Sequence, residues 1–148
     1  MISLTSDAFE HAQPIFENYT GEGEDVSPPL SWSGFPENTR EFALICEDPD
    51  APQDEPWVHW LVYGIPGTRI SMPEGTAGGA FEGRNSWGRP GYNGPLPPPS
   101  HSLHHYHFKL YALDRITGLS LSATKDDLTQ AIEEHILDEG ELVGTYER

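Results

Sequence analysis

Two largely apolar runs, residues 42–48 and 57–65, are rich in β-branched and aromatic residues. Because successive side chains of a strand point to opposite faces, the even-numbered residues of the first run share one face. By the same rule, the odd-numbered residues of 57–63 share one face of the second run. The pattern predicts two strands, with Asp48 and His59 as polar members of these faces.

A loop of carboxylates and prolines separates these strands. Pro49 and Pro52 each fix φ and lack an N–H group, so the first strand must end near Asp48. Asp and Pro are also ordinary turn residues. The residues alone therefore leave two interpretations of the loop, a rigid turn or the mouth of a functional site.

The clearest strand covers residues 102–114. One face is predicted to carry His104, Tyr106, Phe108 and Leu110, and the other His105, His107, Lys109 and Tyr111. The first face is apolar apart from its beginning, so it is expected to pack on the core. His104 and Tyr106 would then lie at the core edge, within reach of a cavity. A buried histidine with one satisfied hydrogen bond is the alternative.

The remaining elements are short. Strands are indicated near residues 2–4, 30–32 and 142–146, and residues 80–82 form a short periodic segment. A helix is predicted to begin after Thr124, where Asp127 completes a variant of the capping box, and to end at Gly140. Its apolar stripe consists of Leu128, Ile132 and Ile136, with Ala131 and His135 alongside.

Residues 66–101 hold many glycines and prolines and little periodicity. Such a stretch is too long for an ordinary connection within a compact domain, which indicates a wrapped functional loop. The run Pro97–Pro99 could also be a polyproline ligand for an aromatic groove. A rigid wall beside a pocket is the preferred interpretation.

Length and charge limit the classes of function. The 148 residues suit a single domain over 1–148, and the formal net charge is −16 with only two lysines, Lys109 and Lys125. Counterion release requires clustered cations, so nucleic acid and anionic membranes are not expected partners. A homodimer is left open.

Residues 1–14 contain neither a positively charged start nor a long apolar run, so no secretory signal or membrane insertion is expected and the predicted location is cytoplasmic. Cys46 is the only cysteine and shares the apolar face of its strand, which predicts a core residue.

Four histidines, His101, His104, His105 and His107, raise the question of a metal site. His105 and His107 are expected to point away from His104, and the spacing matches no ligand pattern. The sequence therefore predicts neither a metal nor a cofactor.

Several motifs together resemble the phosphatidylethanolamine-binding protein family, and most of all its bacterial and archaeal branch, often called Raf-kinase-inhibitor-like. In chain order they are Ser27-Pro-Pro-Leu-Ser-Trp32, Asp48-Pro-Asp-Ala-Pro52, Trp57-Val-His59-Trp, Gly91-Tyr-Asn-Gly-Pro-Leu-Pro-Pro98, His104-His-Tyr106 and Gly140-Glu-Leu-Val-Gly-Thr-Tyr146.

The resemblance implies a mainly β fold, in which a large sheet packs on a smaller one beside a C-terminal peripheral α-helix. It also implies a small pocket for phosphate, acetate or a phospholipid head group. The matching positions in this sequence are Asp48, Asp50, Trp57, His59, Gly94, Pro95 to Pro97, His104 and Tyr106.

Two positions depart from the family pattern. His105 stands where the family usually has Arg, so any contact that needs that arginine is weakened. Asp25 stands where the prokaryotic branch commonly has Asn, which is expected to alter a turn.

The combined hypothesis is anion capture. Asp48 would orient an imidazole, while His59, His104, Tyr106 and loop N–H groups would donate to the anion. Two rival functions are a weak hydrolase that uses Asp48 with His59 or His104, and an inhibitor that binds a kinase or protease. No serine elbow or metal motif is present, so the sequence favours a binding protein over an enzyme.

Overall fold

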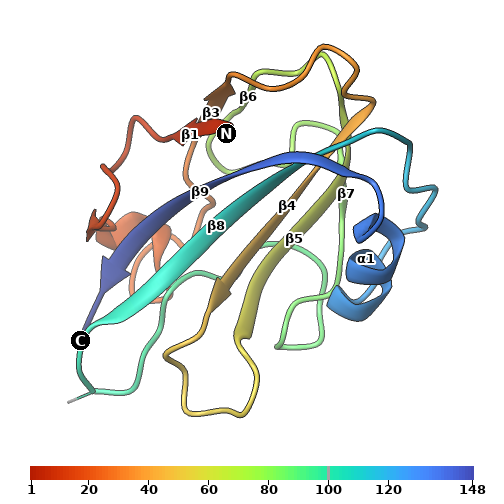
Figure 1. Ribbon diagram of the computed structural model, residues 1–148. Coiled ribbons are helices and arrows are strands. Elements are labelled where there is room, and N and C mark those ends of the chain that lie inside the picture. The colour runs from red at the N-terminus through yellow and green to blue at the C-terminus, as the bar shows by residue number, and fades with distance from the viewer. Residues whose placement is uncertain (100) are drawn as a thin grey trace.

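The computed structural model describes residues 1–99 and 101–148, and these form two β-sheets and one short α-helix (Figure 1). The large sheet has six strands in the order β2-β9-β8-β4-β5-β7, and the small sheet has three in the order β1-β3-β6. Paired strands are antiparallel except β2 and β9, which run parallel. The mainly β prediction is therefore confirmed.

The strands of the large sheet are β2 (Gln13–Pro14), β9 (Ile136–Tyr146), β8 (His104–Leu113), β4 (Glu41–Asp48), β5 (Trp57–Pro66) and β7 (Phe81–Glu82). The small sheet contains β1 (Ser3–Thr5), β3 (Leu30–Ser33) and β6 (Ser71–Met72). A 3₁₀ turn, η1 (Glu17–Tyr19), follows β2, and α1 (Lys125–Ile132) precedes β9. Among the described residues, no helix is long and apolar enough to cross a membrane.

Both faces of the large sheet are buried at its centre. One face packs against the small sheet, where Phe42 and Leu44 of β4 and Phe108 of β8 join Trp32 of β3 in the main core. The opposite face packs a second cluster beneath α1. All eight residues of β4 are buried as a result, which explains the continuous apolar run at residues 42–46.

The predicted face of β5 is partly wrong. Glu47 pairs with Val58 and Cys46 pairs with Trp60, so His59 is an extra residue in the ladder, a β-bulge. Beyond the bulge the alternation shifts by one position. Trp60 therefore packs in the main core, whereas Leu61 lies in the cluster beneath α1, on the opposite face. The bulge lets one strand supply His59 to the site and Trp60 to the core.

The helix is shorter than predicted. α1 ends at Ile132, and the segment expected to continue it forms the first half of β9. Its residues pair with β8 along the ladder from Leu113↔Ile136 to Leu110↔Gly140. Gly140 is a residue of β9 and not a helix cap. Its backbone lies against Ile2, and a Cβ atom on Gly140 would come 2.4 Å from the carbonyl oxygen of Ile2. The sheet therefore overrides the helical spacing of Ile136.

The N-terminal end of α1 is fixed by two polar devices. Thr124 Oγ1 accepts a hydrogen bond from Asp127 N at 3.1 Å, and Asp127 Oδ2 accepts one from Thr124 N at 3.0 Å. Lys125 of the first turn and Lys109 of β8 both pair with the buried Glu47, at 2.5 and 3.0 Å. The two lysines of the chain are therefore held beside α1.

Removing the cap should destabilise the protein measurably. Thr124→Ala is expected to lower the free energy of unfolding by about 1 kcal/mol, because the backbone N–H of Asp127 loses its acceptor. Urea denaturation measures the change. Thr129→Ala, an exposed position inside the same helix, is the matched control and should be neutral or slightly stabilising. Equal losses in the two variants would show that the cap contributes nothing.

Candidate functional site

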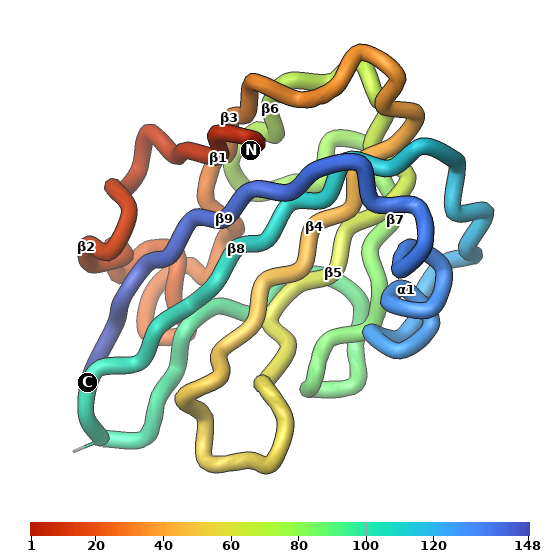
Figure 2. Tube along the Cα trace, viewed as in Figure 1, coloured from red at the N-terminus to blue at the C-terminus, as the bar shows by residue number. Residues whose placement is uncertain are grey.

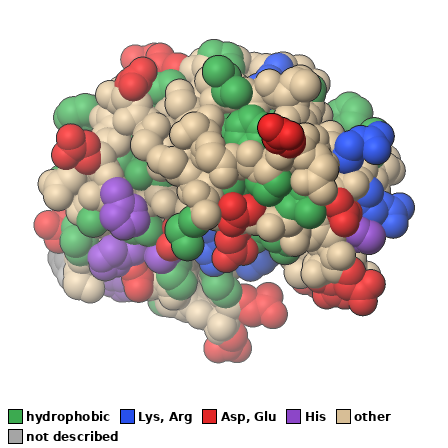
Figure 3. Space-filling model, turned by 45° about the horizontal axis from the view of Figure 1, so that its top comes forward, with side chains coloured by type: hydrophobic (Ala, Val, Ile, Leu, Met, Phe, Trp, Pro, Cys, Tyr) green, Lys and Arg blue, Asp and Glu red, His purple; other side chains and the backbone are tan. Residues whose placement is uncertain are grey.

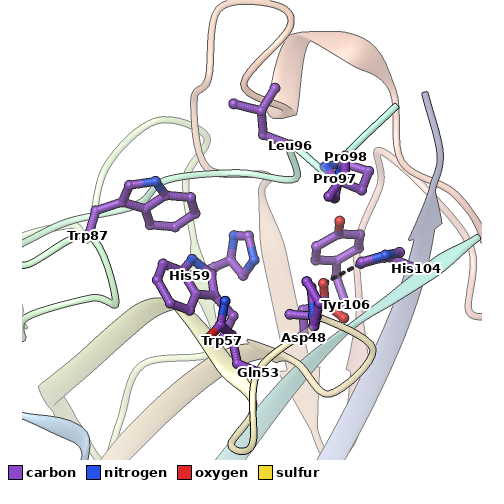
Figure 4. Close-up of a pocket in the computed structure, with 12 residues that line it drawn as sticks. Asp48, Gln53, Trp57, His59, Trp87, Leu96, Pro97, Pro98, His104 and Tyr106 are labelled. Atoms are coloured by element: carbon purple, nitrogen blue, oxygen red, sulfur yellow. Dashed lines mark hydrogen bonds and ion pairs between the residues drawn. The ribbon is translucent and has the colours of Figure 1, made fainter. Parts of the chain in front are cut away.

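A cavity of about 240 Å³ opens where the end of β4 and the beginnings of β5 and β8 meet the long loop between β7 and β8 (Figure 4). In Figure 4, Tyr106 lies between His59 and His104, with Pro97 and Pro98 on the loop side. The lining residues are Asp48, Ala51, Pro52, Gln53, Trp57, His59, Trp87, Leu96, Pro97, Pro98, His104 and Tyr106.

Asp48 is the last residue of β4 and is almost completely buried. Its Oδ1 accepts a hydrogen bond from Asp50 N at 2.8 Å, and its Oδ2 lies 2.7 Å from His104 Nδ1. Both carboxylate oxygens are therefore engaged within the protein. The arrangement makes Asp48 an orienting group, which fixes the ring of His104 and the course of the proline loop.

His104 begins β8, and Asp48 determines how its ring is used. A carboxylate can only accept a hydrogen bond, so Nδ1 of His104 carries a proton and donates it in a hydrogen bond to Asp48. The other ring nitrogen, Nε2, takes no part in this contact. His104 Nε2 lies 3.4 Å from Nδ1 of His101, a ring in the preceding loop. This distance is long for a hydrogen bond, so Nε2 of His104 stays available at the cavity rim.

His59 is the bulged residue of β5, and its Nδ1 lies 2.6 Å from the carbonyl oxygen of Asn93. Burial lowers the pKa of His59 from its ordinary value of 6.5, although the contact with Asn93 and the charge of Asp48 act in the opposite direction. The neutral ring is therefore the favoured form near neutral pH.

Tyr106 provides a hydroxyl group at the centre of the site. Its ring centroid lies 5.1 Å from that of His59 and 6.4 Å from that of His104. Burial, followed by the charge of Asp48, raises the pKa of Tyr106 far above its ordinary range, so the phenol keeps its proton. Within residues 1–99 and 101–148 no fully buried polar side-chain atom lacks a partner. No hydrogen bond of the Tyr106 hydroxyl group is found in this part of the chain. The hydroxyl group is therefore not fully buried and opens to the cavity.

Gly94 and Pro95 do not line the cavity but hold its wall in place. A Cβ atom on Gly94 would come 2.2 Å from the carbonyl oxygen of Tyr19, so only glycine fits there. Gly94 N donates to Asp25 Oδ1 at 2.7 Å, and Gly21 N donates to the carbonyl oxygen of Pro95 at 2.8 Å. Asp25 adopts a φ of 59°, a conformation that Asp and Asn tolerate, as expected for a turn residue.

Asp50 also lies outside the cavity, where it pairs with His105. Its Oδ2 accepts hydrogen bonds from the backbone N and from Nδ1 of His105, at 2.8 and 2.7 Å. Burial acts to raise the pKa of Asp50, but the hydrogen bonds from His105 outweigh it and the pKa is lowered. On the loop wall, the carbonyl oxygen of Pro97 accepts from Arg148 Nε at 2.6 Å.

The structure thus brings Asp48, Trp57, His59, Pro97, His104 and Tyr106 together around one cavity, and assigns Asp50, Gly94 and Pro95 to its support. Sequence reasoning missed Trp87, whose ring lies 5.5 Å from Trp57 and 5.1 Å from His59. Asn85 Oδ1, which accepts from Trp87 N at 2.9 Å, positions this ring. The only signal was a tryptophan within an aperiodic glycine-rich loop. Ala51, Pro52, Gln53 and Pro98 also line the cavity and were not among the predicted site residues.

The other histidines of β8 point away from the cavity. His105 contacts Asp50, and His107 Nδ1 lies 3.0 Å from Glu141 Oε2. In the part of the chain that the structure describes, no group of three or more His, Cys, Asp and Glu side chains is placed to hold a metal ion.

The chemistry of the site is that of binding and proton exchange. Two imidazoles and one phenol face a small space, and a carboxylate orients one of the imidazoles. Among the described residues that line the cavity there is no serine, threonine, cysteine or lysine to act as a nucleophile. Asp48, which the hydrolase alternative uses, has both carboxylate oxygens engaged within the protein.

The fold and the site define a two-sheet β protein with a small pocket of imidazole, phenol and indole groups at one end of its large sheet. Residues 5–147 match the model of the phosphatidylethanolamine-binding protein family, and the chain belongs to that family.

Relatives and solved structures agree with this assignment. A UPF0098 protein of Methanothermobacter thermautotrophicus is 42% identical over 153 residues, which cover 99% of each chain. A phosphatidylethanolamine-binding protein homologue of Chlamydia trachomatis superposes with a TM-score of 0.94 at 39% identity, over 99% of this chain and 97% of that one. YbcL of E. coli, described as a member of the mammalian family, gives 0.92 at 32% identity, over 99% and 98%.

Proposed function

We propose that the cavity binds a small anion, such as phosphate or the phosphate of a head group. The observation that carries the proposal is the convergence of Tyr106, His59 and His104 on a space of about 240 Å³. Phenol O–H and protonated imidazole N–H groups are donors to oxyanions. The name of the family model, phosphatidylethanolamine-binding protein, supports a phosphate-bearing ligand.

The charge distribution predicts weak affinity. The net charge of −16 repels anions at long range, and Figure 3 shows acidic side chains spread over the face on which histidines gather at one side. The favourable contacts act only inside the cavity. We therefore expect added salt, provided its own anions do not fill the site, to strengthen phosphate binding by screening the surface.

The affinity should rise as pH falls. The lone pair of a neutral imidazole repels an anion, whereas a proton shared between ring and anion, brought by either of them, forms a hydrogen bond. Because burial lowers the pKa of His59, the free protein protonates this ring only below 6.5. The affinity for phosphate should therefore increase as pH falls through that value, and continue to increase until the pKa of His59 in the free protein is passed.

Removing the hydroxyl group of Tyr106 tests the proposal. Tyr106→Phe keeps the buried ring but removes one donor, so the affinity for inorganic phosphate should fall about tenfold. Calorimetric titration at about pH 6 measures the change. Tyr111→Phe is the matched control, because Tyr111 lies on the opposite face of the same strand. Unchanged affinity in Tyr106→Phe, or binding that is independent of pH, would contradict the proposed function.

A further inference from the structure

From the donors and acceptors of the empty pocket, we infer that its ligand is an oxyacid that brings its own proton: hydrogen phosphate or the monoanion of a phosphomonoester. An oxyanion of the same size and charge without an O–H group should bind more weakly. The inference rests on the proposed function and names the ligand class of the same site.

The first acceptor is Nε2 of His59. The partner of Nδ1 is a backbone carbonyl oxygen, that of Asn93 at 2.6 Å, and a carbonyl oxygen can only accept. The proton of the neutral ring is therefore on Nδ1, and Nε2 presents a lone pair. Because the ring lines the cavity and burial favours its neutral form, this lone pair requires a donor from the ligand.

The second acceptor is Nε2 of His104. Asp48 Oδ2 accepts from Nδ1 at 2.7 Å, so in the neutral ring Nε2 again carries the lone pair. The nearest alternative partner is the exposed His101, at 3.4 Å. A neutral pocket therefore presents two imidazole acceptors.

Apart from Tyr106, the side-chain donors around the same space belong to residues that are exposed or half-buried, namely Gln53, Trp57 and Trp87. The hydroxyl of Tyr106 is the buried donor, because its pKa is held far above the ordinary range. In the loop after β4, Pro49 and Pro52 have no N–H group, and the N–H of Asp50 already bonds to Asp48. The N–H of Gln53 bonds within its own loop, to the carbonyl oxygen of residue 51 at 2.7 Å. The sequence predicted that N–H groups of the loop donate to the anion. Two of them, those of Asp50 and Gln53, are already hydrogen-bonded within the protein.

The charged groups that face His59 are carboxylates. Asp48 of β4 and Asp25 of the N-terminal segment both act to raise the pKa of His59, but burial outweighs them and the pKa is lowered. Tyr106 of β8 is neutral, and His104 is paired with Asp48. A fully deprotonated anion would meet the lone pair of His59 and would have to recruit a proton from solvent. A P–O–H group supplies that proton directly to His59.

Methyl phosphate and methyl sulfate make a matched pair for the test. Below about pH 6 methyl phosphate is mainly a monoanion with one O–H, whereas methyl sulfate has the same shape and charge without a proton. At about pH 5.5 the unaltered protein should bind methyl phosphate at least about tenfold more tightly, since the sulfate leaves a buried acceptor unpaired. Calorimetry in buffers of different ionisation enthalpy should show proton uptake with methyl sulfate and little with methyl phosphate.

A variant ties the preference to His59. His59→Gln removes the imidazole acceptor while its amide can still donate to the oxygen of Asn93, so the ratio of the two affinities should fall toward one. His135→Gln, far from the cavity beside Asp114, is the control and should keep the ratio. Equal affinities for the two esters in the unaltered protein, without proton uptake, would overturn the inference alone. If neither ester nor inorganic phosphate binds, the proposed function fails and the inference fails with it.

Discussion

Replacing His104 with alanine is expected to lower the free energy of unfolding by about 3 to 5 kcal/mol, because the change leaves a buried carboxylate without its partner. His104 and Asp48 have side chains only 3% and 4% exposed and are joined at 2.7 Å. The two residues lie far apart in the sequence. Their contact therefore joins the start of β8 to the end of β4, where the proline loop begins. Urea denaturation at neutral pH gives the value directly.

A control on the same strand separates the buried pair from an ordinary surface contact. His107 pairs with Glu141 at 3.0 Å, but the two side chains are 26% and 43% exposed. Its replacement by alanine should cost less than about 1 kcal/mol. If His104→Ala cost no more than His107→Ala, the Asp48–His104 pair could not be the anchor of the site.

The second large effect is expected from Gly94→Ala. A Cβ atom at this position would come 2.2 Å from the carbonyl oxygen of Tyr19, 2.8 Å from Asp25 Oδ1 and 2.9 Å from Tyr92 Oη. The carbonyl oxygen of Tyr19 belongs to the backbone, and Asp25 Oδ1 is held by a hydrogen bond from Gly94 N. Because these two atoms cannot easily move aside, the loop must move. We expect a loss of about 3 kcal/mol of stability, together with loss of phosphate binding, because the loop wall shifts away from the cavity.

Gly118→Ala provides the comparison. It replaces a glycine with a φ of +68° that has nothing within 4 Å of the added Cβ atom, so it tests backbone strain without a clash. It should cost about 1 to 2 kcal/mol and leave phosphate binding unchanged. Retained binding in Gly94→Ala would mean that the position of this loop does not shape the site.

Alternation predicted the buried face of β8 correctly. It placed Asp48 and His104 on the core-facing sides of their strands, and the pairing of β4 with β8 brings the two side chains together. Tyr106, Phe108 and Leu110 are buried on one face of β8 as expected.

The failures have physical causes. The bulge at His59 and the register shift near Gly64, which has a φ of +69°, each displace the alternation of β5, and a bulge leaves little mark in sequence. Ile136 matches both a helical stripe and a strand, and pairing with β8 decides between them. Trp87 lies in a loop, where no periodicity indicates toward which side a side chain points.

A crystal structure of the protein soaked in phosphate at about pH 6 tests the central claim most directly. We expect an anion inside the cavity, within hydrogen-bond distance of Tyr106 Oη and of Nε2 of His59 or His104. A cavity that excludes phosphate while the anion binds elsewhere, or a pocket filled by the protein's own side chains, would contradict it.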